Sequence, residues 1–129
     1  MREAVQITFG RQVYLLRPTF AAYGDIEARL GSLRTVYTTV ASGTATLEAM
    51  AFVAYVGMNQ VDGQKADPKT GIAITEEGVA MGIFENGAWD LEATIKPLSD
   101  FLAALGWTPE QRKKIDAGMD EETGEPSLA

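Results

Sequence analysis

The order of apolar and polar residues begins with a short alternating segment. Apolar and polar residues alternate over residues 5–9, Gly10-Arg11 follows, and a second apolar run ends before Pro18. A period of two is typical of a half-buried strand, and a short glycine-containing break between two such runs is typical of a tight turn. Proline has no N–H to donate to a strand ladder. We therefore predict a β-hairpin over residues 4–17.

Most of the remaining chain follows a helical period instead. Segments with apolar residues three and four positions apart begin after Thr19, Ser32 and Thr44 or Thr46, and a further one carries Trp89 and ends at Gly106. Helix start signals predict two more helices, one from Thr75 and a short, mostly polar one from Thr108. Serine and threonine hydroxyls accept hydrogen bonds from first-turn amides, which is typical of helix N-caps. Pro97 lies inside the segment that carries Trp89, so it should kink that helix or mark its restart. We predict a mainly α fold, in which a bundle of five to six helices over about residues 19–117 follows the hairpin.

Three segments refine this outline. The predicted helix over about residues 47–57 is apolar around most of its circumference, which favours a central, buried position. Residues 59–74 are rich in Asn, Asp, Gly and Pro and form the main irregular loop. This loop resembles a calcium loop from Asp62, but Gln64 and Ala66 stand where acidic ligands are required, so we expect no calcium site. Residues 118–129 are polar and acidic, and we predict a disordered tail there after one domain over residues 1–117.

Composition removes several classes of chemistry. The 129 residues include no Cys and no His, which excludes disulfides, thiol nucleophiles, zinc-cysteine sites and Ser-His-Asp hydrolases. The sequence has no GxGxxG or GxxxxGK[ST] loop, and its tyrosines and carboxylates have simpler explanations on helix faces and at helix starts. We expect neither an enzyme nor a cofactor. With no signal-peptide h-region and no apolar run near the length of a membrane span, we expect a cytoplasmic location or a place in a virion.

Charge divides the chain unevenly. The formal net charge is −7, yet residues 1–34 carry five Arg against three acids, whereas residues 35–111 carry three Lys against ten acids. Residues 112–129 carry three bases against five acids. Phosphate contacts need clustered Lys and Arg, so the acidic middle argues against nucleic-acid binding there. The arginine-bearing hairpin leaves nucleic-acid binding open as an alternative, beside the simpler interpretation that its charges are solvated.

The N-terminal third also carries a family resemblance. Residues 7–20, ITFGRQVYLLRPTF, and residues 23–31, YGDIEARLG, resemble the opening of small tail proteins of phages and gene transfer agents. The later helices, from Glu76 to Gly106, are similar to the second half of that family, so the resemblance covers about residues 5–106. The family is described both as tail tube protein and as tail assembly chaperone, with genes near those of the major tail protein and the tape measure protein. It implies no catalytic residues.

The resemblance implies tail morphogenesis without catalysis. A tail assembly chaperone would cover helices of the tape measure protein by helix-in-groove packing, and the major tail protein is the other expected partner. Aromatic residues are the candidate contacts, although core packing is the competing interpretation for each: Tyr23, Tyr37, Trp89 and Trp107. The alternative is a structural tail tube component that forms homo-oligomers by strand addition at the edge of the hairpin.

Overall fold

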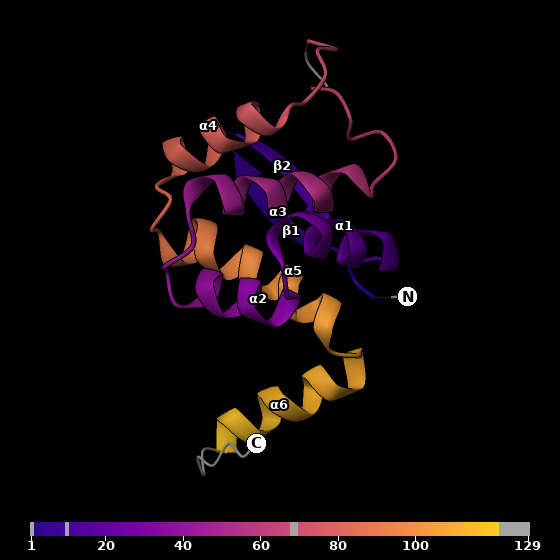
Figure 1. Ribbon diagram of the computed structural model, residues 1–129, viewed down its shortest axis with the longest axis vertical. Coiled ribbons are helices and arrows are strands. Elements are labelled where there is room, and N and C mark those ends of the chain that lie inside the picture. Colours follow the sequence, from indigo (N-terminus) through magenta and orange to yellow (C-terminus); the bar gives the residue numbers. More distant parts are fainter. Residues whose placement is uncertain (1, 10, 68–69, 122–129) are drawn as a thin grey trace.

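The computed structural model describes residues 2–9, 11–67 and 70–121. In this part of the chain a two-stranded hairpin precedes six α-helices and one short π-helix (Figure 1). The predicted fold class, mainly α with an N-terminal β-hairpin followed by helices, is confirmed. No helix in the described ranges combines the length and the apolar character needed to cross a membrane.

The hairpin forms as the alternating pattern predicts. Strand β1 (Val5–Phe9) pairs antiparallel with β2 (Gln12–Leu16), in a register that places Val5 opposite Leu16 and Phe9 opposite Gln12. One face of the hairpin packs against the helices, and Ile7 and Leu16 on that face are almost completely buried. The hairpin therefore supplies part of the core and is not an independent unit.

Most of the helices begin at the N-cap residues that the sequence predicts. Their bounds are α1 (Phe20–Leu30), α2 (Leu33–Ala41), α3 (Leu47–Asn59), α4 (Glu76–Asn86), η1 (Leu91–Ile95), α5 (Lys96–Gly106) and α6 (Pro109–Glu121). The hydroxyls of Thr19, Thr46 and Thr75 each accept a hydrogen bond from the amide three residues later. Thr108 and Gln111 form a reciprocal capping box at the start of α6.

The start of α2 differs from the prediction. The Ser32 hydroxyl makes no cap hydrogen bond. A carboxylate oxygen of Glu27, in the last turn of α1, accepts the hydrogen bond of the Leu33 amide instead, at 2.9 Å. Gly31 has φ +92°, a conformation that favours glycine, and it turns the chain sharply enough for Glu27 to reach that amide. A side chain in the last turn of α1 thus caps the start of α2.

The segment that carries Trp89 and Pro97 is divided in two. Trp89 precedes the helical part, which opens with the π-helix η1 from an N-cap at Asp90. Pro97 lies in the first turn of α5, which follows η1 without a break because Ile95 and Lys96 both have helical backbone angles. The predicted restart is therefore not seen, and the proline lies where π-helical bonding changes to α-helical bonding.

The core surrounds α3, which crosses the middle of the molecule in Figure 1. Val53 and Ala54 of this helix have no exposed surface, and it contacts β2, α1, α4 and α5. Gly57 lets α3 approach the rest of the core closely, because a Cβ there would lie 2.9 Å from Cζ of Phe101 and 3.0 Å from Cβ of Leu16. The central position predicted for this helix is correct.

The irregular loop and the C-terminal helix complete the fold. Ala66 and Ala73 form an isolated bridge within the predicted loop over residues 59–74, and the loop begins later than predicted because α3 continues through Asn59. Helix α6 continues through Glu121, so residues 118–121 of the predicted tail are helical, and the prediction was wrong there. Gly118 does not end the helix, since an interior glycine costs only about 1 kcal/mol. Residues 122–129 lie outside the described residues.

Candidate functional site

The four aromatic residues predicted as partner contacts lie in different surroundings. The rings of Tyr37 and Trp107 pack edge to face with their centroids 5.9 Å apart, and both side chains are partly buried. This pair joins α2 to the end of α5, as core packing requires. Tyr23 lies on α1 and is 37% exposed, whereas Trp89 lies between α4 and η1 and is 87% exposed. Of the four, Trp89 is the side chain most available to a partner.

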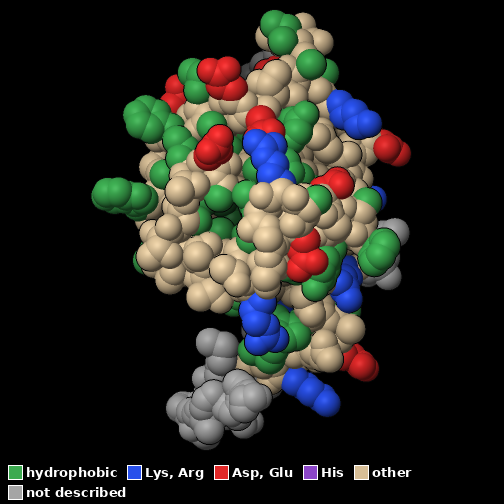
Figure 2. All heavy atoms as spheres, in the orientation of Figure 1, with side chains coloured by type: hydrophobic (Ala, Val, Ile, Leu, Met, Phe, Trp, Pro, Cys, Tyr) green, Lys and Arg blue, Asp and Glu red, His purple; other side chains and the backbone are tan. Residues whose placement is uncertain are grey.

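Trp89 is not an isolated exposed residue. The large exposed hydrophobic side chains among the described residues are Val13, Phe20, Tyr23, Ile72, Met81, Phe84, Trp89 and Leu91. Half of them fall within residues 81–91, on α4, on η1 and in the turn between these two elements, which contact each other. Figure 2 shows hydrophobic side chains protruding at the left of the view, where α4 ends and the chain turns toward η1. We call Met81, Phe84, Trp89 and Leu91 together the α4–η1 surface.

Helix α4 presents part of this surface because its opposite side is committed to the core. Val79 and Ile83 on that side are buried, and α4 packs there against α3 and β1. Gly82 allows the close approach to β1, since a Cβ at this position would lie 3.1 Å from Cγ of Phe9. Met81 and Phe84, three residues apart, therefore point away from the core and are 58% and 71% exposed.

A hydrogen-bonded turn fixes the position of Trp89. The amide of Gly87 donates to the Phe84 carbonyl at 3.1 Å, and the amide of Asp90 donates to the Gly87 carbonyl at 3.0 Å. Gly87 has φ +94°, which a residue with a Cβ rarely adopts. The Asp90 carboxylate then accepts hydrogen bonds from the amides of Glu92 and Ala93, which starts η1 immediately after the turn.

Two further contacts hold this turn against the body of the protein. The fully buried Thr94 hydroxyl donates to the Gly87 carbonyl at 3.0 Å. The Asn86 side-chain amide donates to the Thr8 carbonyl on β1. The exposed apolar side chains of the α4–η1 surface thus project from a backbone that is fixed at both ends, so little backbone ordering remains to oppose binding.

The border of the α4–η1 surface is acidic. Residues 70–95 contain no Lys or Arg and five acids, namely Glu76, Glu77, Glu85, Asp90 and Glu92. Glu76 forms an ion pair with Arg29 at 2.9 Å, and Asp90 caps η1. Within the described ranges, the exposed carboxylates of Glu77, Glu85 and Glu92 have no ion-pair partner. The surface therefore combines apolar side chains with unneutralised negative charge.

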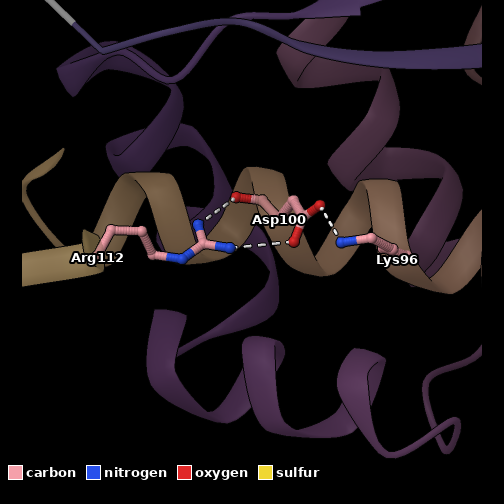
Figure 3. Close-up of polar contacts among 3 residues, drawn as sticks. All are labelled: Lys96, Asp100 and Arg112. Carbon is pink, nitrogen blue, oxygen red and sulfur yellow. Dashed lines mark hydrogen bonds and ion pairs between the residues drawn. The ribbon is translucent and has the colours of Figure 1, made fainter. Parts of the chain in front are cut away.

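A different acid, Asp100, is neutralised within the fold. Its carboxylate lies between Arg112, with Nη2 to Oδ1 at 3.1 Å, and Lys96, with Nζ to Oδ2 at 3.0 Å (Figure 3). Arg112 also donates to the Asp100 carbonyl. These contacts join α6 to α5, so Asp100 serves the fold and differs from the unpaired acids around α4.

The N-terminal arginines are dispersed by the fold. Arg2 donates to the carbonyls of Ala104 and Leu105 at the end of α5, at 3.0 and 2.9 Å. The Arg29 guanidinium lies 4.3 Å from the centre of the Phe52 ring while it pairs with Glu76. Two of the five arginines in residues 1–34 therefore make intramolecular contacts with helices.

A cavity of about 380 Å³ lies between the hairpin, the loop and α4. Its lining includes Tyr14 and Asp67. Burial, and then the negative charge of Asp67, raise the pKa of the Tyr14 phenol above its ordinary value. A phenol with a raised pKa keeps its proton at neutral pH and is a poor general base. No group of three acidic side chains in the described residues is arranged to hold a metal ion.

The α4–η1 surface includes residues that the sequence analysis missed. Met81 and Phe84 lie three residues apart, on the side of α4 opposite Val79 and Ile83. Apolar residues on two opposite sides of one helix were the sequence signal that could have identified this surface. No sequence signal identified Leu91 as exposed, because the direction of its side chain depends on the π-helical backbone of η1. A search of protein-family models, of curated proteins and of solved structures found no match to the chain.

Proposed function

We propose that this protein is a non-catalytic tail assembly chaperone of a phage or gene transfer agent, and that it binds the tape measure protein. The observation that carries a binding role is the α4–η1 surface, in which Trp89 is 87% exposed on a fixed backbone. Clusters of exposed apolar side chains on a folded chain commonly mark protein-binding sites. The assignment to tails rests on the family resemblance of residues 7–31 and 76–106.

The proposed mechanism follows from solubility. A tape measure protein exposes long helices before the tail tube encloses them, and their apolar stripes would associate with one another. A small folded protein that covers such a stripe prevents this association by burying the same apolar area. Its net charge of −7 keeps the resulting complex soluble, because complexes of like charge repel each other.

The structural alternative, polymerisation by strand addition, has less support at the hairpin. The backbone N–H and carbonyl of Leu15 on β2 already bond to the Gln64 side chain, and the Arg17 amide bonds to the Gly57 carbonyl. On β1, the Thr8 carbonyl accepts from Asn86. A strand that added to either edge would have to displace these contacts. The nucleic-acid alternative would rest on Arg11 and Arg17 of the hairpin alone, because Arg2 and Arg29 make intramolecular contacts.

Co-expression with segments of the tape measure protein tests the proposal. We expect at least one otherwise insoluble helical segment to become soluble and to co-purify with the protein. We also expect the protein to be absent from purified tails by mass spectrometry, because a chaperone leaves when the tube encloses its client. If no segment binds and the protein is present in tails in stoichiometric amount, the structural alternative replaces the proposal.

A further inference from the structure

We infer that the α4–η1 surface is the docking site for one amphipathic helix that carries Lys or Arg beside its apolar stripe. This inference rests on the proposed function for the identity of the client but names the chemistry of the segment recognised. Helices that dock on apolar surfaces use side chains at positions i, i+3, i+4 and i+7. Met81, Phe84, Trp89 and Leu91 offer an apolar surface for such a stripe.

Trp89 is the expected centre of binding energy. Tryptophan is enriched among the few interface residues that dominate affinity, and its large ring buries much apolar area. Its neighbours Phe84 and Leu91 are 71% and 68% exposed, so an occupant that covered Trp89 would cover these side chains as well. The hydrogen-bonded turn at Gly87 and Asp90 already fixes the backbone, which leaves mainly side-chain ordering to oppose association.

The negative charge around the α4–η1 surface determines which kind of helix it favours. Glu77 and Glu85 lie one helical turn before and after Met81, and Glu92 follows Leu91 directly. No base occurs between residues 70 and 95, so an acidic helix would be repelled and a helix with Lys or Arg flanking its apolar stripe would be attracted.

The same charges disfavour two other occupants. A second copy docked symmetrically through this surface would place its own Glu77, Glu85 and Glu92 against the same acids. Residues 118–129 of this chain carry four acids and no base, so the C-terminal segment has the same sign as the surface. A separate, basic helix is the occupant that complements both the apolar and the charged parts.

Two synthetic helical peptides provide the test. Both carry the same Leu and Phe residues at i, i+3, i+4 and i+7, flanked by Lys and Arg in one and by Glu in the other. We expect the full-length protein to bind the basic peptide by calorimetry, with weakening by added salt and a blue shift of the tryptophan fluorescence that Trp89→Ala abolishes. Equal affinity for the two peptides, or binding of neither, would overturn the inference.

Matched variants locate the binding. We expect Trp89→Ala and Phe84→Ala each to weaken basic-peptide binding by about tenfold or more, the loss typical of a residue that dominates an interface. Phe20→Ala is the control, because Phe20 on α1 is 96% exposed but lies outside the α4–η1 surface, and we expect it to bind as wild type does. All three side chains are exposed, and circular dichroism verifies that each variant folds. Unchanged binding by Trp89→Ala and Phe84→Ala would refute the site.

A charge-reversed triple variant, Glu77→Lys with Glu85→Lys and Glu92→Lys, separates charge from apolar contact. We expect its preference to change to the acidic peptide, and a retained preference for the basic one would overturn the role assigned to these acids. A concentration-dependent dimer that Trp89→Ala abolishes would instead identify a second copy as the occupant. If wild type binds the basic peptide but no tape measure segment, the proposed function fails and the site stands. If segment binding survives Trp89→Ala and Phe84→Ala, only the site fails.

Discussion

The side chain of Gln64 forms with Leu15 the pair of hydrogen bonds that a neighbouring strand would otherwise supply. Its Oε1 accepts from the Leu15 amide at 2.8 Å, and its Nε2 donates to the Leu15 carbonyl at 2.9 Å and to the Met58 carbonyl at 3.1 Å. One residue of the loop thus closes part of the edge of β2 and fastens the loop to the end of α3.

Removing this amide should loosen the hairpin edge. We expect Gln64→Ala to lower the free energy of unfolding in urea by about 1–2 kcal/mol, because it leaves backbone groups of Leu15 without their partner. Gln6→Ala, at an exposed position on β1, should change it by less than about 0.5 kcal/mol. Equal effects of the two substitutions would show that the Gln64 contacts contribute nothing specific.

The cap of α2 gives a second prediction. Glu27→Ala removes the acceptor of the Leu33 amide, so we expect it to destabilise the protein by about 0.5–1 kcal/mol. Ser32→Ala should leave thermal stability almost unchanged, since the Ser32 hydroxyl makes no cap hydrogen bond. Thermal unfolding of the two variants decides between them, and a larger loss for Ser32→Ala would contradict this assignment.

Two helical glycines should respond to alanine in opposite directions. At Gly57 a Cβ would lie 2.9 Å from a ring carbon of Phe101, so we expect Gly57→Ala to cost about 1–3 kcal/mol despite the better helix propensity of alanine. At Gly24, on the exposed side of α1, no atom lies within 4 Å of the added Cβ. Gly24→Ala should therefore stabilise the protein by about 0.5–1 kcal/mol. Unfolding in urea measures both changes, and two changes of the same sign would disprove the packing argument.

The contact between α5 and α6 should affect local order more than global stability. Arg112 and Asp100 are partly exposed, and such ion pairs contribute at most about 1 kcal/mol. We expect Arg112→Ala to accelerate amide hydrogen exchange in α6 while the rest of the protein exchanges as before. The exposed neighbour Lys113 makes a matched control, because Lys113→Ala keeps both ion pairs of Asp100. Uniform acceleration across the whole protein would contradict a local role.

Alkaline stability should depend on Tyr14. Burial and the nearby Asp67 raise the pKa of its phenol above the ordinary value of 10.0, so the folded state holds the proton more tightly than the unfolded state does. The resulting stabilisation is fully present below pH 10 and is lost as the pH rises through the higher folded-state pKa. We expect the free energy of unfolding to fall less steeply above pH 10 in Tyr14→Phe than in wild type. Identical slopes would remove Tyr14 as the cause.

Local signals in the sequence were sufficient for most of the fold. The hairpin at residues 4–17 follows from alternation and one glycine-containing turn, and Thr19, Thr75 and Thr108 mark helix starts because each cap acts on the next few residues. The cap from Glu27 was missed because its carboxylate reaches across the turn between two helices. The contact of Gln64 with Leu15 spans 49 positions, and nothing in the local pattern indicates it.

The candidate site was less predictable for a related reason. Trp89 was identified as a possible contact, together with Tyr37 and Trp107, which pack against each other from elements far apart in the sequence. The local sequence pattern around an aromatic residue is the same whether or not another element covers its side chain in the fold. Exposure depends on which side of each element remains uncovered after packing, and that is a property of the whole fold.

The location of α6 has a practical consequence for single-molecule and immobilised measurements. In Figure 1 this helix lies at the bottom of the molecule, whereas α4 lies at the top. A dye or a surface linker attached to an exposed residue of α6, such as Lys113, therefore joins the molecule at the end opposite α4. A sensor chip coated with the protein through this helix should therefore leave the α4–η1 surface uncovered, accessible to any helix that passes in solution.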